Sequence, residues 1–403
     1  MTTGRPFEGV RILEVAAWTF VPGAGAVMAD LGADVIKVEP PTGDPQRGLM
    51  NALRSESGAT ANPFVEIPNR GKRSITLDLA ADAGRSVLLE LAATSDVFLT
   101  SYLPAVRSKL RIELADLREA NPRIIYACGH GWGQRGPMVD TGGFDLASAW
   151  ASASMAFKMT RPGSSPMFQP AAFFDLQGSN TIAGAIGTAL YHRERSGEPT
   201  EIDVSLLSVG MWSLSPDVMA GPFTGGLPHP DRRRVPNPIT NDYPTADGRW
   251  LYLVCLQSDR YWDELCAVIG RPDLAADERF GDMAARATNA EACVAELEKT
   301  FVAETLEVWR ERLSSFSGVW APCLTPAEVH EHAAVLANGY LPEVTTNDGS
   351  TFRLPSPPAQ YGGVPSEPQG PAPELGQHTE EILLELGHDW DHIGDLRAAG
   401  ALG

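Results

Sequence analysis

The first half of the chain alternates short apolar runs with amphipathic segments. Runs of five or six residues rich in β-branched side chains predict strands at 10–15, 34–39, 74–79, 96–100, 124–128 and 201–205. Apolar residues at helical spacing predict helices between them, at 23–31, 81–94 and 114–120, and another helix from 206. This alternation is typical of an α/β fold, in which helices cover both faces of a parallel sheet.

The pattern changes beyond residue 220. Residues 221–238 begin with several Gly and Pro, contain three consecutive arginines, and predict a linker. A second unit starts at 239, and its predicted elements are a strand at 250–256 and helices at 261–269, 290–301 and 306–313. Beyond it we expect a helix start at 325–328, a hairpin at 343–354, an extended Pro-rich segment at 355–373 and a last helix at 380–386.

One acidic residue, Asp175, follows two phenylalanines and opens a helix rich in Gly and Ala. Glycines at 178, 184 and 187 weaken this helix, which indicates that another backbone or a bulky ligand packs closely against it. The ordinary interpretation of an Asp at this place is an N-cap. A catalytic carboxylate is the alternative, and the helix pattern alone leaves both open.

Composition excludes several classes of partner. The 403 residues include 32 basic and 51 acidic side chains, a net charge of −19, which argues against nucleic acid and anionic membranes. The first residues do not read as a signal peptide, and no apolar run is long enough for a membrane span. Five scattered cysteines without a C-x-x-C pair fit a reducing compartment, so we expect a cytoplasmic protein. Histidine spacing predicts no metal site.

A partial dinucleotide fingerprint follows the first predicted strand. Gly23 and Gly25 form a G-x-G pair, and Glu39 ends the next strand where an acid could meet a ribose. Met28 stands where the third glycine belongs. A tight strand-to-helix turn is therefore the favoured interpretation, and a nicotinamide or flavin site is the weaker one.

Eight sequence segments carry a resemblance to a known family. They are LGADVIKVEPP (31–41), GDP (43–45), NRGKRSI (69–75), NPRIIY (121–126), GWGQRGP (131–137), LYHRERSG (190–197), DGRW (247–250) and LGQHTE (375–380). In this order the chain resembles the class III CoA-transferases of the formyl-CoA transferase or CaiB–BaiF type, a family that includes α-methylacyl-CoA racemase.

The resemblance implies a domain organisation. We expect a Rossmann-like large domain made of 1–220 and a C-terminal return at 326–403, with a smaller α+β domain at 239–325 beyond the 221–238 linker. It also implies an interlocked homodimer, a threaded arrangement that is rare among proteins.

The resemblance also implies the chemistry. Asp175 matches the aspartate that attacks the acyl-CoA carbonyl in the transferases, and it would carry first the acyl group and then CoA. The expected substrates are an acyl-CoA and a carboxylic acid, with no tightly bound cofactor. The intact Asp175 segment argues against a non-catalytic CoA-binding protein.

Family likeness further suggests a set of CoA contacts, which we list here: Trp18, Thr19, Phe20, Lys37, Pro40, Ser101, Tyr102, Phe144 and Asp145. CoA phosphates require cations, for which Arg73, Arg107 and Lys109 are candidates. The chain departs from the family where many members have Asn-Phe-Arg-Pro-Gly, because Leu103 stands here in place of the arginine.

The alternative function is an acyl-CoA racemase. Racemases exchange an α-proton with a His–Asp pair, but their Gly-His-Asp segment reads Gly143-Phe144-Asp145 here, and phenylalanine cannot exchange protons. His130 lies near in sequence and is a candidate substitute base. An apolar set within 144–172 suits a bulky acyl group better than oxalate or formate, although core packing explains the same residues.

Overall fold

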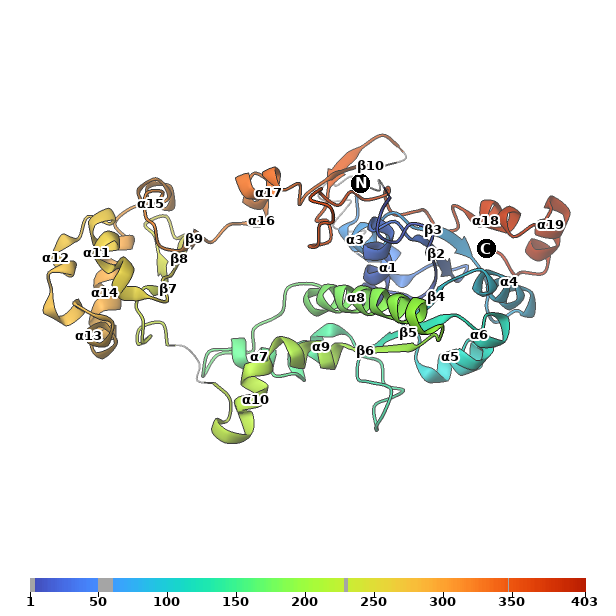
Figure 1. Cartoon of the computed structure of the whole chain (residues 1–403), viewed down its shortest axis with the longest axis horizontal. Helices are drawn as coiled ribbons and strands as arrows, with labels where there is room; N and C mark the ends of the chain where they lie inside the picture. Colours follow the sequence, from blue (N-terminus) through green and yellow to red (C-terminus); the bar gives the residue numbers. More distant parts are fainter. Residues whose placement is uncertain (1–3, 50–60, 228–230, 347) are drawn as a thin grey trace. The chain divides into compact units, whose positions relative to one another are not determined.

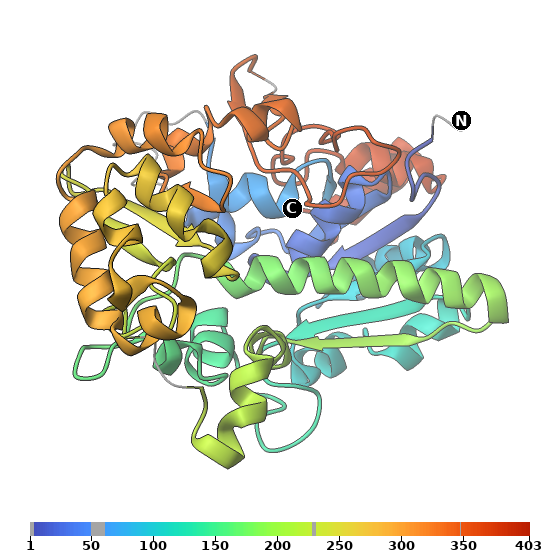
Figure 2. The same ribbon diagram turned by 60° about the vertical axis from the view of Figure 1, so that its left-hand side comes forward.

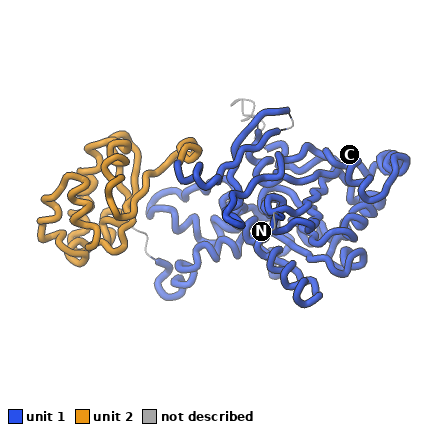
Figure 3. Tube along the Cα trace, turned by 45° about the horizontal axis from the view of Figure 1, so that its top comes forward, with its two compact units in different colours: residues 1–227, 333–403 blue, residues 228–332 orange. Residues whose placement is uncertain are grey.

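The computed structural model describes residues 4–49, 61–227, 231–346 and 348–403. The chain divides into two compact units, which Figure 3 colours separately: unit 1 contains Met1–Leu227 and Ala333–Gly403, and unit 2 contains Pro228–His332. Residues 228–230 of the predicted linker and Asn347 of the predicted hairpin turn lie outside the described residues. No helix in the described part of the chain is long and apolar enough to cross a membrane.

Unit 1 is built on a six-stranded sheet in which every neighbouring pair is parallel, with the order β3-β2-β1-β4-β5-β6. The strands are β1 (Arg11–Val15), β2 (Asp34–Glu39), β3 (Arg73–Thr76), β4 (Val97–Thr100), β5 (Ile125–His130) and β6 (Glu201–Ser205). The predicted α/β fold with a parallel sheet is confirmed. The order reverses between β1 and β4, and in such sheets ligands bind beyond the carboxyl ends of the strands at this point.

Each face of the sheet has its own apolar core. Alternation along β1 sends Ile12 to one face and Leu13 to the other, and both are fully buried. Figures 1 and 2 show α8 running along one face. The helices packed on that face are α1 (Phe20–Asp30), α8 (Phe173–Ser196) and α9 (Leu206–Ser213). The other face carries α4 (Asp82–Ala93), α6 (Leu114–Ala120), α18 (Thr379–Glu385) and α19 (Trp390–Ala398).

The C-terminal segment returns to unit 1. The His378 N–H donates to the Ser74 carbonyl of β3 at 2.9 Å, and the Asp78 N–H donates to the Ala401 carbonyl at 2.9 Å. The hairpin strands β10 (Glu343–Thr345) and β11 (Thr351–Arg353) precede this return and pair antiparallel.

The remaining elements of unit 1 are η1 (Pro45–Gly48), α3 (Pro63–Asn69), α5 (Pro104–Leu110), the π-helix η2 (Leu146–Ala151), α7 (Met155–Met159), α10 (Ser215–Thr224) and α17 (Ala333–Ala337). Unit 2 holds an antiparallel sheet of β7 (Thr240–Pro244), β8 (Trp250–Val254) and β9 (Trp320–Pro322). Its helical elements are α11 (Ser258–Val268), α12 (Pro272–Ala275), η3 (Glu278–Phe280), α13 (Met283–Thr288), α14 (Ala290–Phe301), α15 (Leu306–Leu313) and α16 (Pro326–Val329).

Glycines allow α1 and α8 to approach closely. A Cβ added at Gly178 would lie 2.3 Å from the Phe20 ring, and one at Gly23 would lie 2.3 Å from the Ser179 hydroxyl. The close approach predicted for the Asp175 helix occurs at Gly178, where the neighbour is the Phe20 side chain instead of a backbone or a ligand, but a Cβ at Gly184 would meet nothing within 4 Å. The predicted turn at Gly23-Ala24-Gly25 is wrong, because α1 already begins at Phe20 and these glycines are packing positions inside the helix.

We predict that Gly178→Ala destabilises the protein, although Ala is the better helix former. The new methyl group would overlap the buried Phe20 ring, and overpacking of this kind costs about 1–3 kcal/mol. The matched control is Gly394→Ala inside α19, where no described atom lies within 4 Å of the added Cβ. That change should stabilise by up to ~1 kcal/mol. Urea unfolding of both variants checks the prediction, and equal stability of the two would contradict it.

Candidate functional site

A pocket of about 180 Å³ lies where β1, β4 and β5 end. The residues that line it are Ala17, Trp18, Phe20, Ser101, Leu103, Gly129, His130, Gly131, Gly142, Gly143, Phe144, Asp175 and Leu206. The site therefore stands at the reversal of strand order, and Asp175 supplies its carboxyl group.

Asp175 is the third residue of α8, not its cap. Ala172 precedes the helix with a φ of 56° and makes no side-chain cap bond. The Phe174 N–H in the first turn of α8 donates to Asp145 Oδ2 at 3.3 Å, so Asp145 is the acidic residue that accepts a hydrogen bond from this turn. The N-cap interpretation of Asp175 is wrong. Its burial and, secondarily, the negative charge of Asp145 raise the pKa of Asp175 to about 8. Carboxyl groups perturbed in this way cluster at functional sites.

Ser179 fixes Asp175 relative to the beginning of α1. Its Oγ lies 2.7 Å from the Phe20 carbonyl and 2.8 Å from the Asp175 carbonyl. The two helices therefore begin side by side at the pocket, and their amino ends favour negative charge there.

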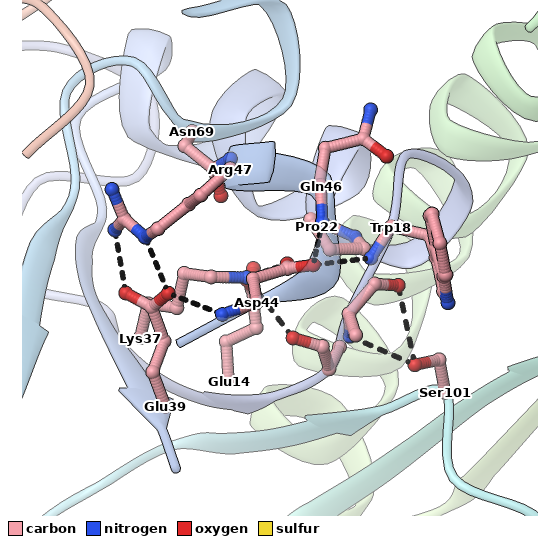
Figure 4. A network of polar contacts seen from close by, with 12 residues as sticks. Glu14, Trp18, Pro22, Lys37, Glu39, Asp44, Gln46, Arg47, Asn69 and Ser101 are labelled. Carbon is pink, nitrogen blue, oxygen red and sulfur yellow. Dashed lines mark hydrogen bonds and ion pairs between the residues drawn. The ribbon is translucent and has the colours of Figure 1, made fainter. Parts of the chain in front are cut away.

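The loop between β1 and α1 forms the facing wall, and side chains from other elements hold its backbone. The Ala17 N–H donates to Ser101 Oγ at 3.0 Å, and the Trp18 N–H donates to Asp44 Oδ1 at 3.2 Å. The Thr19 hydroxyl accepts from Gln46 Nε2 at 2.8 Å. Trp18 has a φ of 70°, a conformation rare for a residue with a side chain. Figure 4 shows Asp44 and Ser101 approaching this loop from opposite sides.

A buried charge cluster stands behind the loop. Lys37 is fully buried, and its Nζ lies 3.0 Å from Asp44 Oδ2, 3.3 Å from Glu14 Oε1 and 3.0 Å from the Ala16 carbonyl. Lys72 Nζ lies 2.7 Å from Glu14 Oε2 and donates to the Pro22 carbonyl in α1 at 2.8 Å. Burial alone would lower the pKa of Lys37, but the carboxylates of Glu14 and Asp44 raise it above its ordinary value.

The position of Lys37 corrects its predicted role. Its amine is enclosed by the cluster and does not reach the pocket, so it supports the loop instead of contacting CoA. Asp44 and Gln46 were not predicted as site residues. The only sequence signal for Asp44 was the GDP segment at 43–45. That segment contributed to the family resemblance, but no role was predicted for it.

Arg73 and Arg107, two of the residues predicted to bind the CoA phosphates, also lie away from the pocket. Arg73 begins β3, so it is at the amino ends of the strands, where it pairs with Asp34 at 2.7 Å and Glu385 at 2.8 Å. Arg107 is buried, and its guanidinium lies 2.6 Å from the Cys128 sulfur. The structure does not bring either residue to the pocket, and their predicted role is corrected.

The remaining predicted contacts fall into two groups. Trp18, Phe20, Ser101 and Phe144 line the pocket with Asp175. Those outside the lining are the buried Thr19 and Asp145, the partly buried Tyr102, and the exposed Pro40 and Lys109.

His130 lines the pocket but has both ring nitrogens engaged. Nδ1 accepts from the Gly133 N–H at 2.9 Å, so the proton of the neutral ring is on Nε2, 2.6 Å from Asp203 Oδ1. The hydrogen bond from His130 lowers the pKa of Asp203. Neither nitrogen is free to take an α-proton, which disfavours His130 as a base. Among the residues that the structure describes, no group of three or more His, Cys, Asp or Glu could hold a metal ion.

The chain is similar over most of its length to several known proteins. The model of CoA-transferase family III matches residues 7–379. The probable fatty acyl-CoA transferase Rv3272 of Mycobacterium tuberculosis is 32% identical, over 94% of this chain and 98% of its own. A crystal structure of Rv3272 has a TM-score of 0.80 at 30% identity and covers 94% of this chain and 99% of that one. A CaiB/BaiF family protein from Brucella suis has a TM-score of 0.84 at 26% identity, over 95% and 100%.

A further relative is the (R)-2-hydroxy-4-methylpentanoate CoA-transferase of Clostridioides difficile, 26% identical over 97% of this chain and 98% of its own. The chain belongs to CoA-transferase family III. It is a CoA-transferase, which moves CoA between an acyl-CoA and carboxylic acids. The family resemblance read from the sequence is confirmed.

The charge cluster generates a stability prediction. Lys37→Met would leave the buried Asp44 carboxylate without its lysine partner and Glu14 with Lys72 alone, and breaking a buried ion pair costs about 3–5 kcal/mol. The matched control is Lys109→Met, an exposed lysine on α5. The free energy of unfolding of this control should change by no more than about 0.5 kcal/mol. Urea unfolding of the two variants without substrate checks this; an equally small loss in both would show that the cluster does not support the fold.

Proposed function

We propose that Asp175 is the nucleophile of the transfer and holds the activated group throughout. The observation that carries this proposal is its place in the pocket, as a partly buried carboxyl group between the amino ends of two helices. Apolar side chains around it would keep water from the intermediates, which are readily hydrolysed.

The reaction begins when an Asp175 carboxylate oxygen attacks the thioester carbonyl of the donor. The C–S bond breaks, CoA leaves as a thiolate, and a mixed anhydride between Asp175 and the acyl group remains. The thiolate then attacks the Asp175 carbonyl carbon of the anhydride. The donor acid leaves as a carboxylate, and Asp175 holds CoA as a thioester.

The second half repeats these steps in reverse order with the acceptor. The acceptor carboxylate attacks the aspartyl thioester and releases CoA thiolate, which leaves a new mixed anhydride. The thiolate attacks the acceptor carbonyl, and the Asp175 carboxylate is regenerated. No proton is consumed over the cycle. The amino ends of α1 and α8 would stabilise the negative charge that develops at each attacked carbonyl.

We further propose that the chain works as the interlocked homodimer implied by its family resemblance. Three large apolar side chains on α9 and α10 are more than three-quarters exposed: Trp212, Met219 and Phe223. A groove of about 630 Å³ also opens between the outer side of α8, at Gly184 and Tyr191, and the Pro-rich segment at Pro357. Apolar surface of this extent supports burial against a second copy. Exposed Pro40 and Lys109 remain candidates for CoA contacts.

We predict that Asp175→Asn nearly abolishes transfer but leaves CoA binding intact, because the amide cannot form the anhydride. Losing a covalent nucleophile lowers kcat by on the order of 10⁴-fold or more. Mass spectrometry of the wild-type peptide after incubation with acyl-CoA should find CoA or acyl on Asp175, and hydroxylamine should release it. Asp395→Asn, an exposed change on α19, is the matched control. Full turnover in Asp175→Asn would refute the mechanism.

The raised pKa of Asp175 predicts a pH profile. Only the carboxylate attacks, so kcat/KM for the acyl-CoA should rise with pH through about 8 in the free enzyme. Asp145→Asn removes the negative charge that opposes ionisation, so the pKa of Asp175 should fall and the profile should move to lower pH. Asp395→Asn should leave the midpoint unchanged. A midpoint that does not move in Asp145→Asn would contradict this electrostatic account.

A further inference from the structure

Two aromatic rings, those of Trp18 and Phe144, line the pocket together with Asp175. The rings of Trp18 and Phe144 meet edge to face, with centroids 5.3 Å apart and planes at 89°. Both rings line the pocket with Phe20, Leu103 and Leu206. Phe144 is 56% exposed and Trp18 is 36% exposed, so the pair stands at the surface of the fold instead of filling its core.

The backbone at Trp18 is held in a costly conformation. A positive φ at a bulky residue is a strained conformation, and it persists only where the surroundings enforce it. Here Asp44 accepts the Trp18 N–H, and Lys37 binds both Asp44 and the carbonyl of Ala16. Such strain gathers at ligand sites, which indicates that the orientation of the Trp18 ring serves binding.

The side chains that line the pocket offer no cation. None of the described residues in the lining is Lys or Arg. The carboxyl group of Asp175 lies in the lining, and Asp145 accepts a hydrogen bond from the first turn of α8. A second carboxylate on the acyl group would find no cationic side chain in this lining, and it would oppose the ionisation of Asp175.

We propose that the Trp18–Phe144 pair selects acyl groups that are apolar and free of a second carboxylate. This inference rests on the proposed function of Asp175, because it places the acyl group beside that residue. The apolar residues that the sequence offered for the acyl pocket do not line this pocket; they are Trp150, Met155, Phe157, Met159, Met167 and Phe168. Trp150 is a buried core residue, whereas Phe157, Met167 and Phe168 are exposed and lie outside the lining.

The test uses CoA thioethers, which bind but cannot react. S-hexyl-CoA and S-(3-carboxypropyl)-CoA add the same number of non-hydrogen atoms to the sulfur, and calorimetry measures the affinity of each. Wild-type protein should bind the hexyl compound more tightly by on the order of tenfold to a hundredfold. Equal binding, or tighter binding of the carboxypropyl compound, overturns the proposal.

Substitutions at Phe144 test the pair directly. Phe144→Lys supplies the missing cation and should narrow or reverse the preference, whereas Phe144→Leu should keep its direction. Trp390→Phe, a change of an exposed aromatic residue on α19, should leave the ratio unchanged. An unchanged ratio in Phe144→Lys would also overturn the proposal.

Thioether binding is independent of the chemistry at Asp175, so the two proposals can fail separately. If wild-type protein shows no thioether preference but CoA is still trapped on Asp175 from acyl-CoA, the proposed selectivity is rejected and the proposed nucleophile is retained. If the preference is present but no adduct forms on Asp175, the nucleophile is rejected and the selectivity is retained.

Discussion

The close contact between α1 and α8 is the constraint on which the site depends. Phe20 fills the space that a side chain at Gly178 would need, and Ser179 joins the beginnings of the two helices by its hydroxyl. The helices carry opposite sides of one pocket, Asp175 on α8 and the Trp18 loop before α1. A nucleophile gains most when its geometry is fixed before the substrate arrives. Under the proposed mechanism, glycine at these positions would contribute to catalysis through packing, at a cost in helix propensity.

The charge cluster of Lys37, Glu14, Asp44 and Lys72 holds the other side of the pocket. A buried ion pair is a weak source of net stability, because desolvating the charges offsets their attraction. Its directional bonds to the Ala16 carbonyl and the Trp18 N–H act differently, since they hold backbone groups of the loop that lies between β1 and α1. An apolar core would pack equally well there but would leave these groups unbonded and the loop free to relax from its positive φ.

Much of the fold could be predicted from the sequence, because it depends on local patterns. The helices at Leu114–Ala120 and Ala290–Phe301 match their predicted bounds, whereas the helix at Pro104–Leu110, which begins with a first-turn proline, was missed. The choice of Asp175 also came from a local pattern together with the family resemblance. The roles of charged residues could not be read in this way: nothing local distinguishes a lysine that binds phosphate from Lys37, which pairs inside the protein. Arg73 did carry a signal, since a residue that begins a parallel strand lies at the edge opposite the ligand.

In the mechanism that we propose, burial of Asp175 serves two requirements that oppose each other. The anhydride and thioester must be kept from water, which favours an enclosed carboxyl group, but the attack requires that group to be ionised. Enclosure and the neighbouring Asp145 raise the pKa of Asp175 to about 8. The amino ends of α1 and α8 act in the opposite direction, since their partial positive charge favours the carboxylate and each later oxyanion. Once the acyl group is on Asp175, the residue carries no charge, so the repulsion from Asp145 is relieved. The same charge that disfavours the free carboxylate therefore favours the covalent intermediate relative to it.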